Sequence, residues 1–270
     1  MHTPEARSSQ LPRALAKGHG RRLGGAVSTP LLTLIALAAV QEGLARSGAI
    51  NPRKFPPVSQ VLEALLAEIS QGRLWSPLAQ TLGTWALAVL VSFVLALLLG
   101  IGLGSHRFIR AAATPIIEFI RPVPSTALIP LVVLTLGSGL QGALFLTCFG
   151  TVWQILPSIF RGLGQVETVA EDTARAFSFS RWQRLRWLVV PSMLPFLWTA
   201  LRLGAAAALV LLISMELLAG INGIGHEIAN AYAGANTPTL YAYILVAALI
   251  GGAVNLLLGA YVKQRTGGEA

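Results

Sequence analysis

An uncharged, apolar stretch from Leu78 to Ser105 constrains this chain more than any other feature of its sequence. A helix that crosses the hydrocarbon core of a bilayer needs about 20 mostly apolar residues, and this stretch exceeds that length. The whole chain follows the same pattern, because 54% of its 270 residues are hydrophobic and only 11% are charged. A soluble domain carries about 25% charged residues. The sequence therefore predicts an all-α integral membrane protein.

Apolar stretches of spanning length predict about six transmembrane helices, over residues 24–45, 78–103, 116–136, 140–160, 194–218 and 239–262. Residues 58–69 carry apolar side chains at helical spacing, with Glu63 and Glu68 off that stripe. This pattern predicts a short amphipathic helix at the membrane surface. Residues 219–238, which include neither Lys nor Arg, are expected to form a loop.

The third predicted span differs from the others because Pro122, Pro124 and Pro130 interrupt it. Proline removes a backbone hydrogen bond, and in lipid the freed carbonyl must find another partner. We therefore expect this broken helix to face protein or a water-filled path. Five glycines in the second and sixth spans are expected to allow close helix packing, namely Gly100, Gly102, Gly104, Gly251 and Gly252.

The basic residues indicate an orientation. Cytoplasmic loops of membrane proteins are enriched in Lys and Arg. With both termini in the cytoplasm, 14 of the 20 Lys and Arg residues lie on the cytoplasmic side and four outside. The cytoplasmic set is Arg7, Arg13, Lys17, Arg21, Arg22, Arg107, Arg110, Arg161, Arg175, Arg181, Arg184, Arg186, Lys263 and Arg265, and the outer set is Arg46, Arg53, Lys54 and Arg73. This bias also explains the net charge of +9 without invoking a nucleic acid.

Several kinds of chemistry are excluded or unsupported by the sequence. The three lysines, Lys17, Lys54 and Lys263, do not follow glycine, so the Gly-Lys of a phosphate-binding loop is absent. If the chain moves a solute with ATP, another subunit must hydrolyse it. The single cysteine, Cys148, precludes a disulfide framework within one chain. The four scattered histidines show no metal-ligand spacing, and no catalytic constellation is visible.

The polar segment between the fourth and fifth spans predicts a short amphipathic helix over residues 166–177. It has neither proline nor glycine, and one face carries Val166, Val169, Ala170, Thr173, Ala174 and Phe177. Glu171 and Arg175 are spaced for an i,i+4 ion pair. The helix is too short and polar to span a bilayer. On physical grounds it either lies on the membrane surface or docks into a partner, and both readings stay open.

This segment resembles a known signature. Asp172-Thr-Ala174-Arg175-Ala-Phe-Ser178, followed by Pro191, is similar to the Glu-Ala-Ala, three residues, Gly, Leu-Pro loop of permeases in binding-protein-dependent ATP-binding-cassette importers. The acidic position is Asp172 or Glu171, and the spacing favours Asp172. The chain departs from the signature at Ser178, where the family has Gly, and at Val190, where Leu is usual.

Other motifs resemble the nitrate, sulfonate and taurine branch of this family, in the same order along the chain. They are Phe55-Pro56-Pro57-Val58, Arg121-Pro-Val-Pro124-Ser-Thr-Ala-Leu-Ile-Pro130-Leu, Met215-Glu216 and Gly223-Ile224-Gly225. Together they cover residues 55–225.

The resemblance implies a type I importer permease fold in a bacterial inner membrane. Residues 1–23 would form a cytoplasmic tail, 24–262 the permease domain and 263–270 a second cytoplasmic tail. In the loop 161–187, the residues Glu171, Asp172, Ala174, Arg175 and Ser178 would form the coupling helix that contacts the ATPase.

The implied partners are two ATPase subunits, which would bind ATP and Mg²⁺, a periplasmic or lipid-anchored solute-binding protein, and a second permease chain. That second chain would be either another copy of this chain, which is usual in this branch, or a sister permease. The chain itself would bind no cofactor and would not be an enzyme. Its cargo would be a sulfonate, taurine, nitrate, or a neutral heteroaromatic solute, moved by alternating access.

Three ionisable residues lie in or near the predicted spans. Such groups are costly in lipid and are often functional, so Arg121, Arg202 and Glu216 are candidate residues of the translocation path. The alternative is structural, with Arg121 paired to Glu118 and with Arg202 or Glu216 packed at a helix or dimer interface. A secondary carrier without ATPase subunits is a competing function, with Glu216 as its coupling carboxylate.

Overall fold

The computed structural model describes residues 25–104, 107–166 and 168–265, so the predicted tail over residues 1–23 and most of the predicted tail 263–270 lie outside the described residues. The chain divides into two compact units, residues 1–58 and 59–270. In the first unit, α1 (Gly25–Arg46) is a 22-residue helix at the position of the first predicted span. The side-chain amide of Gln41, on this helix, donates a hydrogen bond to the Pro56 carbonyl at 3.3 Å.

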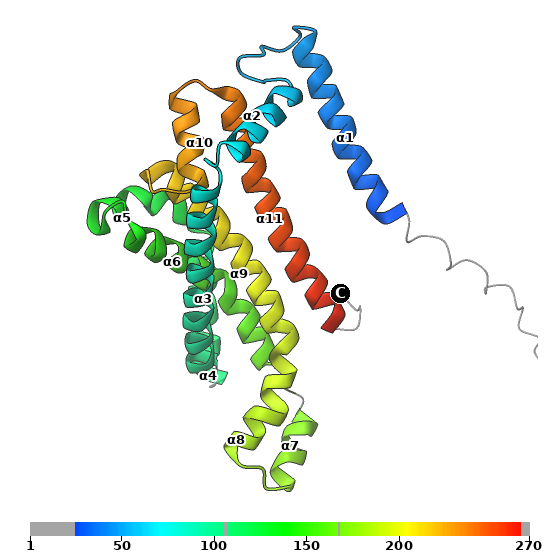
Figure 1. Cartoon of the computed structure of the whole chain (residues 1–270). Helices are drawn as coiled ribbons and strands as arrows, with labels where there is room; N and C mark the ends of the chain where they lie inside the picture. Colours follow the sequence, from blue (N-terminus) through cyan, green and yellow to red (C-terminus); the bar gives the residue numbers. More distant parts are fainter. Residues whose placement is uncertain (1–24, 105–106, 167, 266–270) are drawn as a thin grey trace, which may run out of the picture. The chain divides into compact units, whose positions relative to one another are not determined.

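All regular secondary structure in the described part of the second unit is helical, with short turns between the helices (Figure 1). Its elements are α2 (Val58–Ser70, which begins at the unit boundary), α3 (Trp75–Gly104), α4 (Arg107–Ile120), η1 (Ser125–Leu128), α5 (Ile129–Leu136), α6 (Leu140–Leu163), α7 (Thr168–Ala176), α8 (Arg181–Arg184), the π-turn η2 (Leu185–Val189), α9 (Val190–Ala219), α10 (Ile224–Ala233) and α11 (Thr237–Arg265). In Figure 1, α7 and α8 lie at one end of α9, and α10 lies at the other end.

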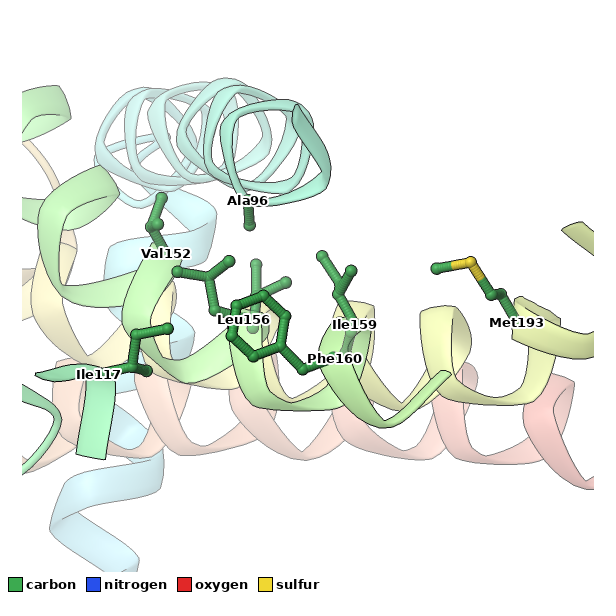
Figure 2. Packing of buried hydrophobic residues seen from close by; sticks show 9 residues of the cluster. Ala96, Ile117, Val152, Leu156, Ile159, Phe160 and Met193 are labelled. Carbon is green, nitrogen blue, oxygen red and sulfur yellow. The ribbon is translucent and has the colours of Figure 1, made fainter. Parts of the chain in front are cut away.

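The core of this unit forms where α6 packs against α3 and α9. A central cluster joins Ala96 of α3, Ile117 of α4, several α6 side chains and Met193 of α9. In Figure 2, Ala96 points toward the α6 side chains Leu156 and Ile159. Two expected glycines allow this approach, because a Cβ at Gly100 or Gly104 would overlap Ile159 or Leu163. A Cβ at Gly102 or Gly252 would meet nothing within 4 Å, so the packing role predicted for those two glycines is wrong within this chain.

Within the described residues, four helical stretches are long and apolar enough to cross a membrane, or up to five if one bent pair counts as a single span. The four are Trp75–Gly104, Leu140–Leu163, Arg181–Ala233 and Thr237–Ala260, and the bent pair is Phe108–Ile120 with Ser125–Leu136. The sequence predicted about six spans, and the one without a counterpart in this set is the first. That α1 crosses the membrane therefore stays a prediction.

The proline-rich third span is broken as predicted, but at one place. The axes of its two halves differ by 73°, with the break between Ile120 and Ser125, where Pro122 and Pro124 lie. Pro130 causes no third interruption, because it occupies the first turn of α5, where its missing N–H would have had no intrahelical partner.

Two helical segments differ from the sequence-based prediction: one was not predicted, and the other is longer than predicted. Residues 219–238 were expected to form a loop, yet they contain the 10-residue helix α10, which begins after a left-handed cap at Gly220. The glycines at Gly220, Gly223 and Gly225 are typical of a loop, but burial of Ile224 against the rest of the unit stabilises the helix. The fifth helical stretch also begins earlier than residue 194, because the π-turn at Leu185–Val189 carries the helix into Pro191.

Candidate functional site

The expected coupling segment forms α7, and its end has a defined cap. The Phe179 N–H donates to the Ala174 carbonyl at 2.9 Å, and the Ser178 N–H donates to the Arg175 carbonyl at 2.9 Å. This pair of bonds is the Schellman arrangement, in which the residue after the helix adopts a left-handed conformation. The chain therefore turns sharply after α7 and enters α8.

Ser178 occupies that left-handed position, with φ of 55°. The conformation disfavours residues with a Cβ and is adopted most readily by glycine. This explains physically why the signature has Gly here. In this chain serine adopts the same backbone geometry, so the departure from the signature leaves the turn in place.

Glu171 links α7 to the helix that follows. Its carboxylate accepts from Arg175 at 3.0 Å, which confirms the predicted i,i+4 pair. The same oxygen also accepts from Arg184 of α8. Sequence reasoning missed this second contact because 13 residues separate the two side chains. Asp172, which the signature spacing favoured as the acidic position, is exposed.

The apolar face of α7 is only partly covered by its own chain. Ala174 is buried, but Val169 and Phe177 are each 75% exposed. Trp182, in the adjacent α8, is 68% exposed. Large apolar side chains gathered on an exposed surface are typical of interaction sites with a protein or a membrane. The five residues predicted to contact an ATPase thus lie together, beside an exposed apolar surface.

Arg121 lies at the break in the third span, between two pockets. One of about 580 Å³ lies between α4 and α6, and another of about 490 Å³ extends from Pro122 to Val210. Its guanidinium donates to the Gln154 side chain at 3.3 Å. Among the described residues, the ion pairs do not join Arg121 to Glu118, so the suggested structural pairing is not formed.

Arg202 is exposed on α9 and faces α11. Its Nε donates to the Asn255 side chain at 2.8 Å. A Cβ on Gly259 would come within 3.3 Å of the guanidinium carbon, so this glycine leaves room for the side chain. The contact fits the packing alternative, while a role for Arg202 in the path stays a prediction.

Glu216 is buried, with 1% of its surface exposed. Its carboxylate accepts from the Thr81 hydroxyl at 2.8 Å and from the Gly225 N–H at 2.9 Å. The Thr81 oxygen in turn accepts from the Ile224 N–H, so the network joins α3, α9 and α10. A Cβ on Gly225 would lie 2.8 Å from Cβ of Glu216, which explains why glycine accompanies this glutamate. These contacts favour the structural alternative for Glu216 over the path.

A second buried glutamate was missed. Glu68 lies off the apolar stripe of α2, where an amphipathic pattern gives no reason to expect burial, yet only 7% of its surface is exposed. It accepts from Arg73 at 2.7 Å and from the Tyr243 hydroxyl of α11 at 3.0 Å. The hydrogen bond to Glu68 raises the pKa of the Arg73 guanidinium above its usual value. No sequence signal marks this contact, because 175 residues separate Glu68 from Tyr243.

Comparison with known proteins places this architecture in a family. Residues 92–264 match the family described as binding-protein-dependent transport system inner membrane component. The taurine transport system permease protein TauC of Escherichia coli is 31% identical over 261 residues, which cover 93% of this chain and 95% of that protein. The bicarbonate transport system permease protein CmpB of Synechococcus elongatus is 26% identical over 95% of this chain and 93% of its own length. The nitrate import permease protein NrtB of Synechocystis is 28% identical over 63% of this chain and 60% of its own length.

The fold also has a counterpart among solved structures. A chain of the MetNI methionine ABC transporter, in an inward-facing conformation, matches with a TM-score of 0.63 and 20% identity. The match covers 73% of this chain and 98% of that one, which confirms the predicted type I importer fold. Because the family model spans more than half of the sequence and a relative above 30% identity spans nearly all of it, this chain belongs to the family of binding-protein-dependent transport system inner membrane components.

Proposed function

We propose that this chain forms the translocation path for a small oxyanion-bearing solute and is driven by separate ATPase subunits that dock on α7. That it is a permease subunit of an importer in an inner membrane follows from its family and its relatives. The named relatives carry taurine, nitrate and bicarbonate, and a further one carries aliphatic sulfonates. These solutes share a compact oxygen-bearing acidic group, which is the chemical class proposed for the cargo here.

The observation that carries the coupling proposal is the surface of α7. Val169 on α7 and Phe177, the residue directly after it, expose apolar side chains. The capped end of the helix and the ion pairs of Glu171 hold this segment against α8. Such a surface fits a protein groove better than a lipid surface, because its helix is short and its polar face carries both acidic and basic residues. ATP and Mg²⁺ would be bound by the partner.

Alternating access requires a membrane domain with two states that bind the ATPase dimer differently. The break at Ile120–Ser125 and the π-turn at Leu185–Val189 are two irregular points at which such helices can bend. A solute-binding protein would deliver cargo at the α10 end, and two copies of this chain would enclose the path. The basic residues support cytoplasmic termini.

The test is gentle purification of the tagged chain with its native partners, followed by measurement of their stoichiometry. We expect a nucleotide-binding subunit in equal number, in a particle holding two copies of each. Reconstituted vesicles should then take up a sulfonate only with ATP and the binding protein. A stable particle of this chain alone that transports without ATP would instead establish the secondary-carrier function.

A further inference from the structure

A groove between α4 and α6 gathers three arginines around an apolar floor. It has a volume of about 580 Å³, and its lining includes Arg110, Glu118, Arg121 and Arg161, with Ile117 and Phe160 beneath them. Ile117 and Phe160 belong to the central core cluster, so the floor of the groove is part of the rigid bundle. The groove therefore presents charged side chains on a fixed support.

The geometry of the two helices explains why the arginines meet. Arg110 and Glu118 lie on α4, Arg121 follows its last residue, and all three side chains line the same groove. The Arg110 guanidinium lies near Gly164, at one end of α6, and Arg121 bonds to Gln154, further back along it. The helices are thus antiparallel here, and the basic side chains line the length of the groove.

The charges in this groove do not balance. Arg161 donates to the Ser158 hydroxyl at 3.1 Å, and Arg121 donates to the Gln154 amide oxygen, so both have neutral partners. In the part of the chain that the structure describes, the four ion pairs involve none of these three arginines. Three guanidinium groups against one carboxylate leave a net positive groove, and a guanidinium fork matches the geometry of an oxyanion.

Arg121 also borders the neighbouring pocket, of about 490 Å³, which reaches Gly150 and Val210. It is therefore shared by two adjoining cavities. We propose that the groove of Arg110, Arg121 and Arg161 is an oxyanion-binding site at the α7 end of the translocation path, with Arg121 at its entrance. The inference rests on the proposed function for the origin of the anion. A cargo sulfonate and a lipid headgroup phosphate offer the same chemistry to this site.

Sulfate binding tests the site directly. The permease–ATPase complex in phosphatidylcholine nanodiscs, without nucleotide or binding protein, should bind radiolabelled sulfate saturably. Arg121→Gln and Arg161→Gln should each weaken binding by about tenfold, the loss expected for one charge-assisted hydrogen bond. Glu118→Gln should strengthen binding, because it removes the one carboxylate in the lining. Arg53→Gln, in the other unit, removes the same charge and should leave sulfate affinity unchanged.

The source of the anion is resolved by repeating the assay in phosphatidylglycerol nanodiscs. If sulfate affinity is unchanged in these nanodiscs, the occupant is a soluble oxyanion. If phosphatidylglycerol competes with sulfate and lowers its apparent affinity, and if Arg121→Gln removes this competition, the occupant is the headgroup phosphate. Either result supports an oxyanion site. Absence of sulfate binding in both discs, or equal affinity of Glu118→Gln and Arg161→Gln, overturns it.

The same samples separate this inference from the proposed function. If the complex forms and the binding protein stimulates its ATPase activity, but sulfate does not bind, the oxyanion site fails while the permease assignment stands. If no ATPase subunit associates, the coupling proposal fails, and sulfate binding to the chain alone still decides the site.

Discussion

Glu216 and Glu171 are both hydrogen-bonded carboxylates near opposite ends of α9, but they differ in burial and in the charge of their partners. Glu216, on α9, is buried against α3 and α10, and its carboxylate accepts from the neutral Thr81 hydroxyl and the Gly225 N–H. Glu171 lies near the surface and is held by Arg175 and Arg184. A buried polar network is costly to disrupt, whereas a surface ion pair contributes little. The network at the α10 end thus stabilises the packing of three helices, whereas the α7 end leaves apolar side chains exposed to a partner.

Truncation of the two glutamates should have very unequal effects. Glu216→Ala should leave the buried Thr81 hydroxyl and Gly225 N–H without an acceptor, at a cost of about 1–3 kcal/mol for each buried group. We expect a large loss of folded protein and of thermal stability in detergent, measured by size-exclusion chromatography after heating.

The matched variant Glu171→Ala should leave the thermal transition nearly unchanged. Glu216→Gln, which keeps an acceptor oxygen, should lie between the two. Equal losses for Glu216→Ala and Glu171→Ala would show that burial does not distinguish the two ends.

The second prediction concerns the exposed surface of α7. Val169→Asp and Phe177→Asp should weaken ATPase association by at least about tenfold, because a charge would be buried in an apolar contact. Thermal stability of the chain alone should not change, since both side chains are exposed. Association is measured by co-purification and by binding-protein-stimulated ATP hydrolysis.

A control for this prediction is Leu66→Asp on α2, where Leu66 is 65% exposed. It introduces the same charge far along the sequence from α7 and should leave ATPase association intact. If it weakened association as much as Phe177→Asp, the docking surface would not be specific to α7.

The left-handed turn at Ser178 should depend on the side chain at that position. Ser178→Gly should stabilise the end of α7 by about 1 kcal/mol, and Ser178→Val should destabilise it by a similar amount, because a β-branched residue is strongly disfavoured at positive φ. Hydrogen exchange of the amides of residues 177–179 measures this local effect. Faster exchange in Ser178→Gly than in the unaltered chain would contradict it.

The smallest effect is expected at the link between α7 and α8. Arg184→Gln removes one of the two arginines on Glu171 and should cost less than about 1 kcal/mol, as for other partly exposed ion pairs. Hydrogen exchange in α7 should rise slightly, and Arg175→Gln, which removes the other arginine, should give a similar rise. A global loss of stability in Arg184→Gln would show that this link supports the whole bundle.

The sequence predicted much of the helical framework because length and hydropathy are local properties. The expected stretches 78–103 and 140–160 agree closely with α3 and α6, and 58–69 agrees with α2. The π-turn before Pro191 and the helix α10 escaped prediction, since prolines and glycines usually end helices. Packing around Ile224 overrides that tendency here.

Of the candidate site, the coupling role of residues 171–178 came from the resemblance to the family signature and stays a prediction, whereas the Glu171–Arg175 pair followed from helical geometry and is present in the structure. It did not identify the partner Arg184, the burial of Glu68, or the groove that joins Arg110 to Arg161. These contacts depend on which helices pack together and in which direction.

By itself, then, the sequence determined that the chain is a helical membrane protein and where most of its helices lie. It also showed that a short amphipathic helix separates the fourth and fifth predicted spans. Each of these features follows from residues that are neighbours in the sequence. Only the tertiary structure decided that Glu216 meets Thr81 from 135 residues away and that three arginines line one groove. Close packing of α3, α4, α6 and α9 brings those side chains together, and neither composition nor periodicity encodes such long-range contacts.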